Sequence, residues 1–193
     1  EKLQFTFAEG SSIGIPTPKT LAPESEADVE RFEPALSYPC LVKPRQSHQY
    51  FDRFRKKLAF VHDKDRLWAA YREAAAAVLG VLLQEWIPGN DTLGANYNSY
   101  FWNGKPLVEF TAEKVRLSPP SFGVPCVVRS ESIPGVIEPG RAILKAMGFY
   151  GYSCSEFKRD ERDGQYKFME INGRFNRSGL LSVRCGINFP WLM

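Results

Sequence analysis

The first half of the chain alternates between short apolar runs and polar stretches that contain proline or glycine. Short apolar runs bounded in this way are typical of strands, and they lie at residues 38–43, 58–61 and 78–84. Stretches rich in helix formers lie at residues 1–10, 27–32 and 65–77. Asp63 or Asp65 is a candidate N-cap for the last of these helices. The basic stretch at residues 45–57 is expected to be a loop.

From residue 96 onward the strand-like runs follow one another more closely. They lie at residues 96–102, 107–116, 124–130, 152–158 and 165–171. Asn103-Gly104 predicts a hairpin between the first two, and a helix over residues 136–147 is expected to end at Gly148 in a left-handed cap. A final helix is expected from about Ser178. Because the order of elements does not follow a βαβ repeat, the pattern predicts an α+β fold with antiparallel or mixed sheets, in two lobes that meet near residues 85–91.

Composition narrows the class of protein further. The chain has 193 residues, of which 44% are hydrophobic, and a net charge of +3. It can therefore bury a sizeable core and is not a strongly basic nucleic-acid binder. No apolar run approaches the ~20 residues of a membrane span. The four cysteines are widely spaced and are expected to be free thiols, as in a cytoplasmic protein.

The residues with the most chemical information lie in the last predicted hairpin. Glu170 and Asn172 are two residues apart on a strand and therefore project from one face. A two-residue turn at Asp163-Gly164 would turn Glu156 away from them, whereas a three-residue loop at residues 162–164 would place Glu156 opposite Glu170. We expect the three-residue loop.

That register also defines the chemistry of both faces of the hairpin. Phe157, Met169 and Ile171 would share the apolar face. The other face would carry two carboxylates and an amide, oxygen ligands that suit Mg²⁺ when phosphate supplies the remaining ones. A solvated hairpin face is the alternative interpretation of the same residues.

The sequence resembles a known family at several places. The stretch MEINGR at residues 169–174 is similar to the E-I-N-P-R motif of ATP-grasp enzymes, the carboxylate–amine and carboxylate–thiol ligases. Further similar stretches, in the family's order and spacing, are GIPTPKT at residues 14–20, YPCLVKP at 38–44 and LLQEWIPG at 82–89. The resemblance covers nearly the whole chain and is strongest to the carboxylate–amine ligase branch. It implies the ATP-grasp fold, with two α+β lobes and a nucleotide bound between them.

The resemblance also implies a division of the chain. Residues 1–14 would be a start segment, residues 15–86 the small lobe and residues 87–193 the large lobe. Family members normally carry a Rossmann-like domain ahead of their first phosphate-binding lysine. Lys2 occupies that lysine's place, so we expect the chain to be the ATP-grasp part of a longer ligase.

Several nucleotide-binding roles follow from the resemblance. The residues implied to bind ATP are Lys2, Lys43, Ser47, Gln84, Glu85, Trp86, Ile87 and Asp91. Lys43 would place a point charge on the phosphates, and Ser47 would belong to a lid over them. The Glu85 carbonyl or side chain and the Ile87 N–H would contact adenine, with Leu83 and Trp86 as apolar walls. Asp91 would hold the ribose, although an aspartate after Gly-Asn is equally typical of a turn.

The metal and catalytic roles follow in the same way. Mg²⁺ or Mn²⁺ would bind Glu156, Glu170 and Asn172. Arg174, Lys114 and Arg116 would be catalytic cations, although Gly173 replaces the proline that usually precedes the arginine. The implied reaction activates a small carboxylate as an acyl-phosphate, which an amine then attacks.

The expected partners are thus ATP, a carboxylate and an amine, without nucleic acid or membrane, and a homodimer is possible. Two alternatives stay open. One is a nucleotide-binding module that does not turn over. The other, which the charge disfavours, is a single-stranded nucleic-acid binder that uses Arg53, Arg55 and Lys56.

Overall fold

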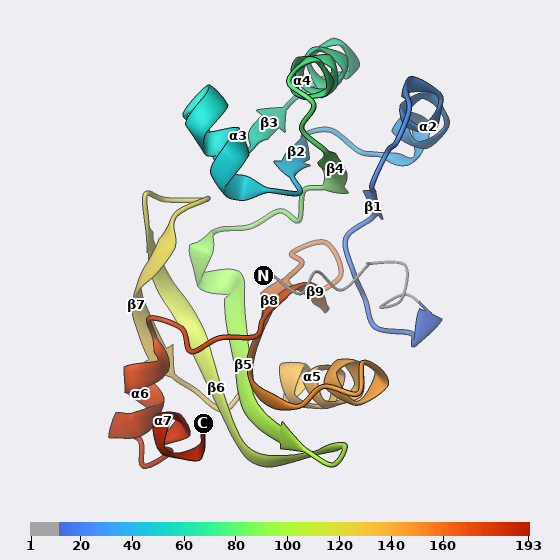
Figure 1. Cartoon of the computed structure of the whole chain (residues 1–193). Coiled ribbons are helices and arrows are strands. Elements are labelled where there is room, and N and C mark those ends of the chain that lie inside the picture. Colours follow the sequence, from blue (N-terminus) through green and yellow to red (C-terminus); the bar gives the residue numbers. More distant parts are fainter. Residues whose placement is uncertain (1–11) are drawn as a thin grey trace. The chain divides into compact units, whose positions relative to one another are not determined.

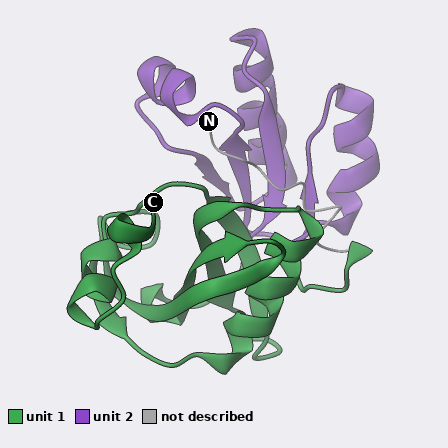
Figure 2. Ribbon diagram, turned by 60° about the horizontal axis from the view of Figure 1, so that its bottom comes forward, with its two compact units in different colours: residues 1–17, 87–193 green, residues 18–86 purple. Residues whose placement is uncertain are grey.

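The computed structural model describes residues 12–193 (Figure 1). The helix expected at residues 1–10 and the candidate Lys2 lie outside the described residues. The chain divides into two compact units (Figure 2). The small unit comprises residues 18–86, and the large unit comprises residues 87–193 together with residues 12–17. No helix in the described part of the chain is long and apolar enough to cross a membrane.

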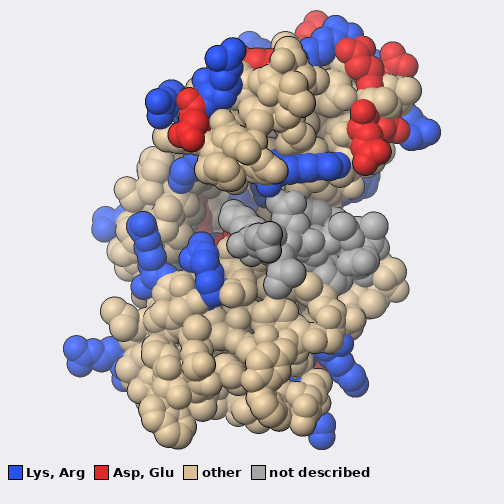
Figure 3. Space-filling view, viewed as in Figure 1, with Lys and Arg blue, Asp and Glu red and all other residues tan. Residues whose placement is uncertain are grey.

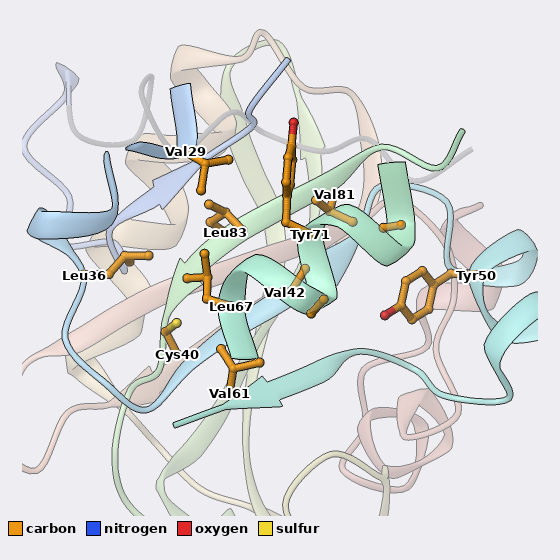
Figure 4. Close-up of a cluster of buried hydrophobic side chains, with 12 residues drawn as sticks. Val29, Leu36, Cys40, Val42, Tyr50, Val61, Leu67, Tyr71, Val81 and Leu83 are labelled. Atoms are coloured by element: carbon orange, nitrogen blue, oxygen red, sulfur yellow. The ribbon is translucent and has the colours of Figure 1, made fainter. Parts of the chain in front are cut away.

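A four-stranded antiparallel sheet, ordered β1-β4-β2-β3, forms the centre of the small unit. Its strands are β1 (Thr20–Leu21), β2 (Cys40–Pro44), β3 (Ala59–Val61) and β4 (Val81–Glu85), and its helices are α2 (Glu26–Phe32), the 3₁₀ turn η1 (Glu33–Ala35), α3 (Ser47–Phe54) and α4 (Lys64–Ala76). Val42 of β2 points into a core that Val29 of α2 and Leu67 of α4 complete (Figure 4). Since strand residues alternate, Leu41 and Lys43 project from the opposite face.

Helix α3 replaces the loop expected at residues 45–57, so that prediction is wrong. Tyr50 and Phe54 are four residues apart and share one face of the helix. Their ring centroids are 4.7 Å apart, and both pack against the small unit's core. Arg53 and Arg55 are exposed on the outside. Although this stretch is basic in composition, two apolar residues, Tyr50 and Phe54, hold it against the core as a helix.

A five-stranded antiparallel sheet, ordered β7-β6-β5-β8-β9, forms the large unit. Its elements are η2 (Asp91–Leu93), β5 (Gly94–Trp102), β6 (Lys105–Ser118), β7 (Val124–Ser130), α5 (Pro134–Ala146), β8 (Gly151–Arg159), β9 (Tyr166–Asn172), α6 (Gly179–Arg184) and α7 (Phe189–Leu192). Helix α5 covers one face (Figure 1), where Ile143 packs with Tyr97 and Phe157. On the other face, Phe189 of α7 packs against Tyr100 and Tyr152.

Two local predictions are confirmed in the large unit and one is corrected in the small unit. Asn103 and Gly104 have φ values of 48° and 72°, as the predicted hairpin turn requires. Gly148, with φ of 58°, ends α5 in a left-handed cap. The strand expected at residues 78–84 begins only at Val81, because Val78 adopts the same left-handed conformation, with φ of 58°, after α4.

Residues 15–17, which the sequence places with the small lobe, group with the large unit instead. The reason is that Ile15 is buried in the large unit's core. In addition, the Pro16 carbonyl accepts a hydrogen bond of 2.8 Å from the Phe168 N–H. All four cysteines are free thiols, as expected, and Cys40 and Cys154 are buried.

Charged side chains are mixed in sign on the small unit. Figure 3 shows Lys and Arg interspersed with Asp and Glu over the face of this unit that is turned to the viewer. This mixture agrees with the net charge of +3 over 193 residues. No single-sign field of the kind that gathers nucleic acid covers this face.

Candidate functional site

The hairpin of β8 and β9 has the predicted pairing of Glu156 with Glu170. The predicted three-residue loop is wrong. Asp160 and Gln165 still pair through a backbone hydrogen bond of 2.9 Å, so the loop has four residues, 161–164. Glu156 pairs with Glu170, whereas the next residue, Phe157, pairs with Phe168. Met169 is therefore an extra, bulged residue of β9, and it shifts the pairing by one residue between the loop and the Glu156–Glu170 pair.

The same bulge decides which apolar residues face the core. Phe168 takes the place expected for Met169, and its ring centroid lies 5.6 Å from that of Phe157. Both rings pack with Ile171 under α5. The loop and the bulge therefore offset one another, and the carboxylates of Glu156 and Glu170 still project from one face.

On that face the structure brings together a compact charged cluster, which we define as Lys114, Glu156, Glu170 and Asn172. The Asn172 Nδ2 donates to Glu156 Oε1 over 3.1 Å and to Glu170 Oε1 over 3.0 Å. The Lys114 Nζ lies 2.5 Å from Glu156 Oε2. Burial opposes the charge on Lys114, but the neighbouring Glu156 outweighs it, with help from Glu170, and raises the pKa of Lys114. The cluster thus holds two carboxylates that are partly neutralised by one lysine.

These residues fit a divalent metal ion. Asn172 places an amide between the two carboxylates, and its oxygen is the atom able to ligate a metal. The buried Oδ1 of Asn96, a residue that pairs with Glu156 across β5 and β8, has no hydrogen-bond partner in the described structure. Three or more His, Cys, Asp or Glu side chains do not gather into a metal site anywhere in residues 12–193. The metal-binding candidate therefore rests on two carboxylates and one amide, those of Glu156, Glu170 and Asn172.

The two other predicted catalytic cations are placed differently from Lys114. Arg116 is exposed on β6, beyond a register irregularity that separates it from Lys114. Two residues apart on a regular strand, Lys114 and Arg116 would share one face, but the irregularity breaks this alternation. Arg174 is also exposed, in the segment that follows β9.

The small unit places three predicted nucleotide-binding residues on or next to its sheet. Lys43 lies on β2 and donates from Nζ to Gln84 Oε1 over 3.1 Å. Gln84 is fully buried and donates in turn to the Thr20 hydroxyl over 2.9 Å. Lys43 and Gln84 thus share the sheet face opposite the core. Ser47 is exposed at the start of α3.

The segment after β4 carries the residues expected to contact adenine. The Glu85 carboxylate accepts from the Lys19 N–H over 3.1 Å, and the Glu85 N–H donates to the Lys19 carbonyl over 2.8 Å. Trp86 packs edge-on against Phe60, with ring centroids 5.5 Å apart. Leu83 is fully buried in the small unit's core, so its expected role as an adenine wall is wrong.

Asp91 follows this segment and holds a turn of the large unit. Its carboxylate accepts from the Ser121 N–H over 3.1 and 3.3 Å. This hydrogen bond joins Asp91 to a residue 30 positions further along the chain, so it is not the local turn contact that the sequence left open. The role in ribose binding stays a prediction.

Sequence reasoning missed two polar features of the large unit. Lys158 donates from Nζ to the carbonyls of Ile87, over 2.9 Å, and Gly89, over 2.8 Å. Asn98 accepts from the Tyr152 hydroxyl over 2.8 Å and from Asn176 over 3.0 Å. Asparagine is depleted in strands, so Asn96 and Asn98 on one predicted strand were an available signal. No local pattern marks Lys158.

No family model matches the chain. In sequence it is 25% identical over 175 residues to a D-alanine–D-alanine ligase of Ectopseudomonas mendocina (strain ymp), covering 83% of this chain and 51% of the relative. It is 27% identical over 198 residues to a D-aspartate ligase of Enterococcus faecium (strain Aus0004), covering 90% and 44%. The chain thus spans about half the length of these curated relatives.

The fold comparison points the same way. A crystal structure of a biotin carboxylase–β,γ-ATP complex from Campylobacter jejuni superposes with a TM-score of 0.71 at 16% identity, covering 93% of this chain and 42% of that one. The two α+β units are those of the ATP-grasp fold. The curated relatives named above are amino-acid ligases, and the chain is similar to them in sequence over 83% and 90% of its own length.

Proposed function

We propose that the chain is the ATP- and Mg²⁺-binding core of a ligase that joins a carboxylate to an amine. The observation that carries this proposal is the cluster of Lys114, Glu156, Glu170 and Asn172 on the large sheet. Its two carboxylates, amide and lysine are the groups needed to hold a metal–phosphate complex. The named relatives, two of them amino-acid ligases and one an ATP complex, support the same reaction class.

Residues of both units would contact the nucleotide. Lys43 and Ser47, with Lys2 from outside the described residues, would bind phosphates. Gln84, Glu85, Trp86 and Ile87 would line the adenine site, and Asp91 would bind the ribose. Lys43 suits its role because its ammonium lies on a rigid strand and is held by Gln84.

Glu156, Glu170 and Asn172 would hold Mg²⁺ or Mn²⁺, which when bound offsets the charge of the phosphate oxygens. Lys114 would then be released from Glu156 to pair with phosphate. The exposed Arg116 and Arg174 are free to reach a substrate anion and would stabilise the transferred phosphoryl group.

The proposed reaction has two steps. A carboxylate oxygen attacks the γ-phosphorus of ATP, and ADP leaves with the electrons of the broken phosphoanhydride bond. The amine nitrogen then attacks the acyl carbon, phosphate leaves, and the nitrogen loses a proton to give the amide. The relatives' names favour amino acids as carboxylate and amine. A cytoplasmic location and a homodimer stay predictions.

The experiment is thermal unfolding of the 193-residue chain with Mg²⁺ and ATP, in the wild type and in Glu170→Ala. We expect Mg²⁺-dependent stabilisation in the wild type and its loss in Glu170→Ala. Glu73→Ala is the control, because Glu73 is exposed on α4 of the small unit. Equal stabilisation of wild type and Glu170→Ala would contradict the metal assignment.

Phosphate release separates a ligase from a module that only binds nucleotide. A mixture of a carboxylate and an amine is expected to stimulate release from Mg-ATP. Binding without any such release would favour the module.

A further inference from the structure

Lys158 is a half-buried lysine that neither the motifs nor the reaction proposed above employs. It lies on β8, two residues after Glu156, so both side chains project from the same face of the large sheet. Its Nζ donates to two backbone carbonyls, those of Ile87 and Gly89. A lysine that donates to two backbone carbonyls separated by one residue fixes the path of that backbone.

The segment that Lys158 holds has little regular structure of its own. Ile87, Pro88 and Gly89 lie between β4 and η2, and Pro88 has no N–H to donate. Gly89 has φ of 103°, and a Cβ at this position would lie 2.2 Å from Leu93 Cδ1. The backbone at Gly89 therefore lies too close to its neighbours for a side chain to fit. The ammonium group of Lys158 holds this backbone through its two hydrogen bonds.

The surroundings of Lys158 are built to accommodate it. Its partner on β5 is Gly94, which carries no side chain, and a Cβ at Gly94 would lie 2.7 Å from Lys114 Cδ. Burial lowers the pKa of Lys158, with Lys114 acting in the same direction, while Asp91, Glu161 and Asp160 oppose this. The two carbonyl bonds of the ammonium group are therefore made in a half-buried setting in which nearby carboxylates favour its charge.

We propose that Lys158 is a positioning residue for the nucleobase. By holding the carbonyls of Ile87 and Gly89 it fixes the backbone that directly follows the Ile87 N–H, the group assigned to the adenine ring, to the strand that carries Glu156. One strand, β8, then sets both the metal-binding carboxylate and the base-binding backbone of the large unit. This inference rests on the proposed ATP site.

Base selectivity tests the proposal. ATP and ITP carry the same triphosphate but differ at the base edge, where ITP lacks the amino group and the N1 acceptor. Dissociation constants for both, with Mg²⁺, are measured by calorimetry on the 193-residue chain. In Lys158→Met the preference for ATP over ITP is expected to fall about tenfold, the effect of one or two lost charge-assisted hydrogen bonds.

Matched variants separate positioning from stability. Lys167→Met removes the lysine that pairs with Lys158 across β8 and β9, and is expected to keep the wild-type preference. Lys158→Arg keeps cationic N–H donors and is expected to retain most of the preference. If Lys158→Met does not fold, Lys158→Gln replaces it, with a smaller fall expected.

Each outcome decides one question. An unchanged ATP preference in a folded Lys158→Met or Lys158→Gln, or an equal loss of affinity for ATP and ITP, would overturn the positioning role while leaving the ATP site intact. Failure of the wild type to bind Mg-ATP would overturn the proposed function, and the positioning role with it.

Discussion

The two sheets of this protein handle polar side chains in different ways. In the small unit, the sheet face opposite the core is linked by a chain of hydrogen bonds from Lys43 to Gln84 and on to Thr20. In the large unit, charged groups pair on both faces of the sheet: Lys114 with Glu156 on one face, and Glu109 with Arg141 of α5 on the other.

The difference shows where electrostatic energy is concentrated. Removing the Thr20 hydroxyl takes away one neutral hydrogen bond, whereas removing one member of a partly buried ion pair leaves an unbalanced charge behind. We therefore expect the large unit to respond more strongly to removal of charge and to pH. It is also the unit whose sheet carries the proposed metal ligands.

The largest expected effect is that of Lys114→Met. It leaves Glu156 beside Glu170 without its cation, and we expect a loss of about 3 kcal/mol in the free energy of unfolding. Thr20→Val, which removes the acceptor of the small sheet's chain, is expected to cost about 1 kcal/mol. Urea unfolding without metal or nucleotide measures both.

A double variant sharpens this comparison. Adding Glu156→Gln to Lys114→Met removes the unbalanced carboxylate and should recover part of the lost stability. If Lys114→Met cost no more than Thr20→Val, the two sheets would not differ in the way described.

A somewhat smaller effect is expected from pH. Glu109 accepts from Arg141 over 2.8 and 2.5 Å and also from the Tyr97 hydroxyl. The bonds from Arg141, more than the opposing burial, hold the pKa of Glu109 below its ordinary value of 4.5. A lowered carboxyl pKa stabilises the fold above the unfolded-state pKa, and this stability is lost as pH falls through the folded-state pKa.

Glu109→Gln is therefore expected to cost about 2 kcal/mol near neutral pH, and the gap to the wild type should close in acid, below the ordinary glutamate pKa. Urea unfolding across this pH range measures the gap. Glu73→Gln is the small-unit control, because Glu73 is exposed on α4 and the variant should follow the wild-type pH profile. A gap for Glu109→Gln that persists unchanged in acid would contradict the prediction.

The smallest expected effect lies outside the sheets, where helices of both units end in the same geometry. Val78 after α4 and Gly148 after α5 both have φ of 58°. A β-branched residue is strained there, and Val78 is 92% exposed and has no packing to lose. Val78→Gly should therefore raise the free energy of unfolding by about 1 kcal/mol, and Gly148→Val should lower it by a similar amount. Thermal unfolding measures both, and a loss of stability in Val78→Gly would show that Val78 is not strained.

The hairpin of β8 and β9 shows how far local sequence patterns reach. Alternation correctly places Glu170 with Asn172, and the demand for an apolar face correctly places Glu156 opposite Glu170. The loop length was not predictable, because a four-residue loop with a bulge at Met169 produces the same pairing at the cluster as a three-residue loop. Pattern determines which residues must share a face, but not the backbone path that brings them there.

Helix α3 shows the opposite case. Its sequence is rich in charged residues. The two residues that stabilise the helix, Tyr50 and Phe54, do so only because they pack against the small unit's core. Leu83 was misjudged for the same reason. An apolar residue on a strand can face either side, and the helices that cover one side decide which.

By itself the sequence determined the order of most elements, the Asn103-Gly104 hairpin, the cap at Gly148 and the ATP-grasp motifs, because these depend on residues close together in the chain. Only the tertiary structure decided that Lys114 pairs with Glu156, that Arg116 does not join it, and that Lys158 holds Ile87 and Gly89. These contacts join residues 42 to 71 positions apart. Their geometry depends on sheet order, bulges and burial, which no short stretch of sequence encodes.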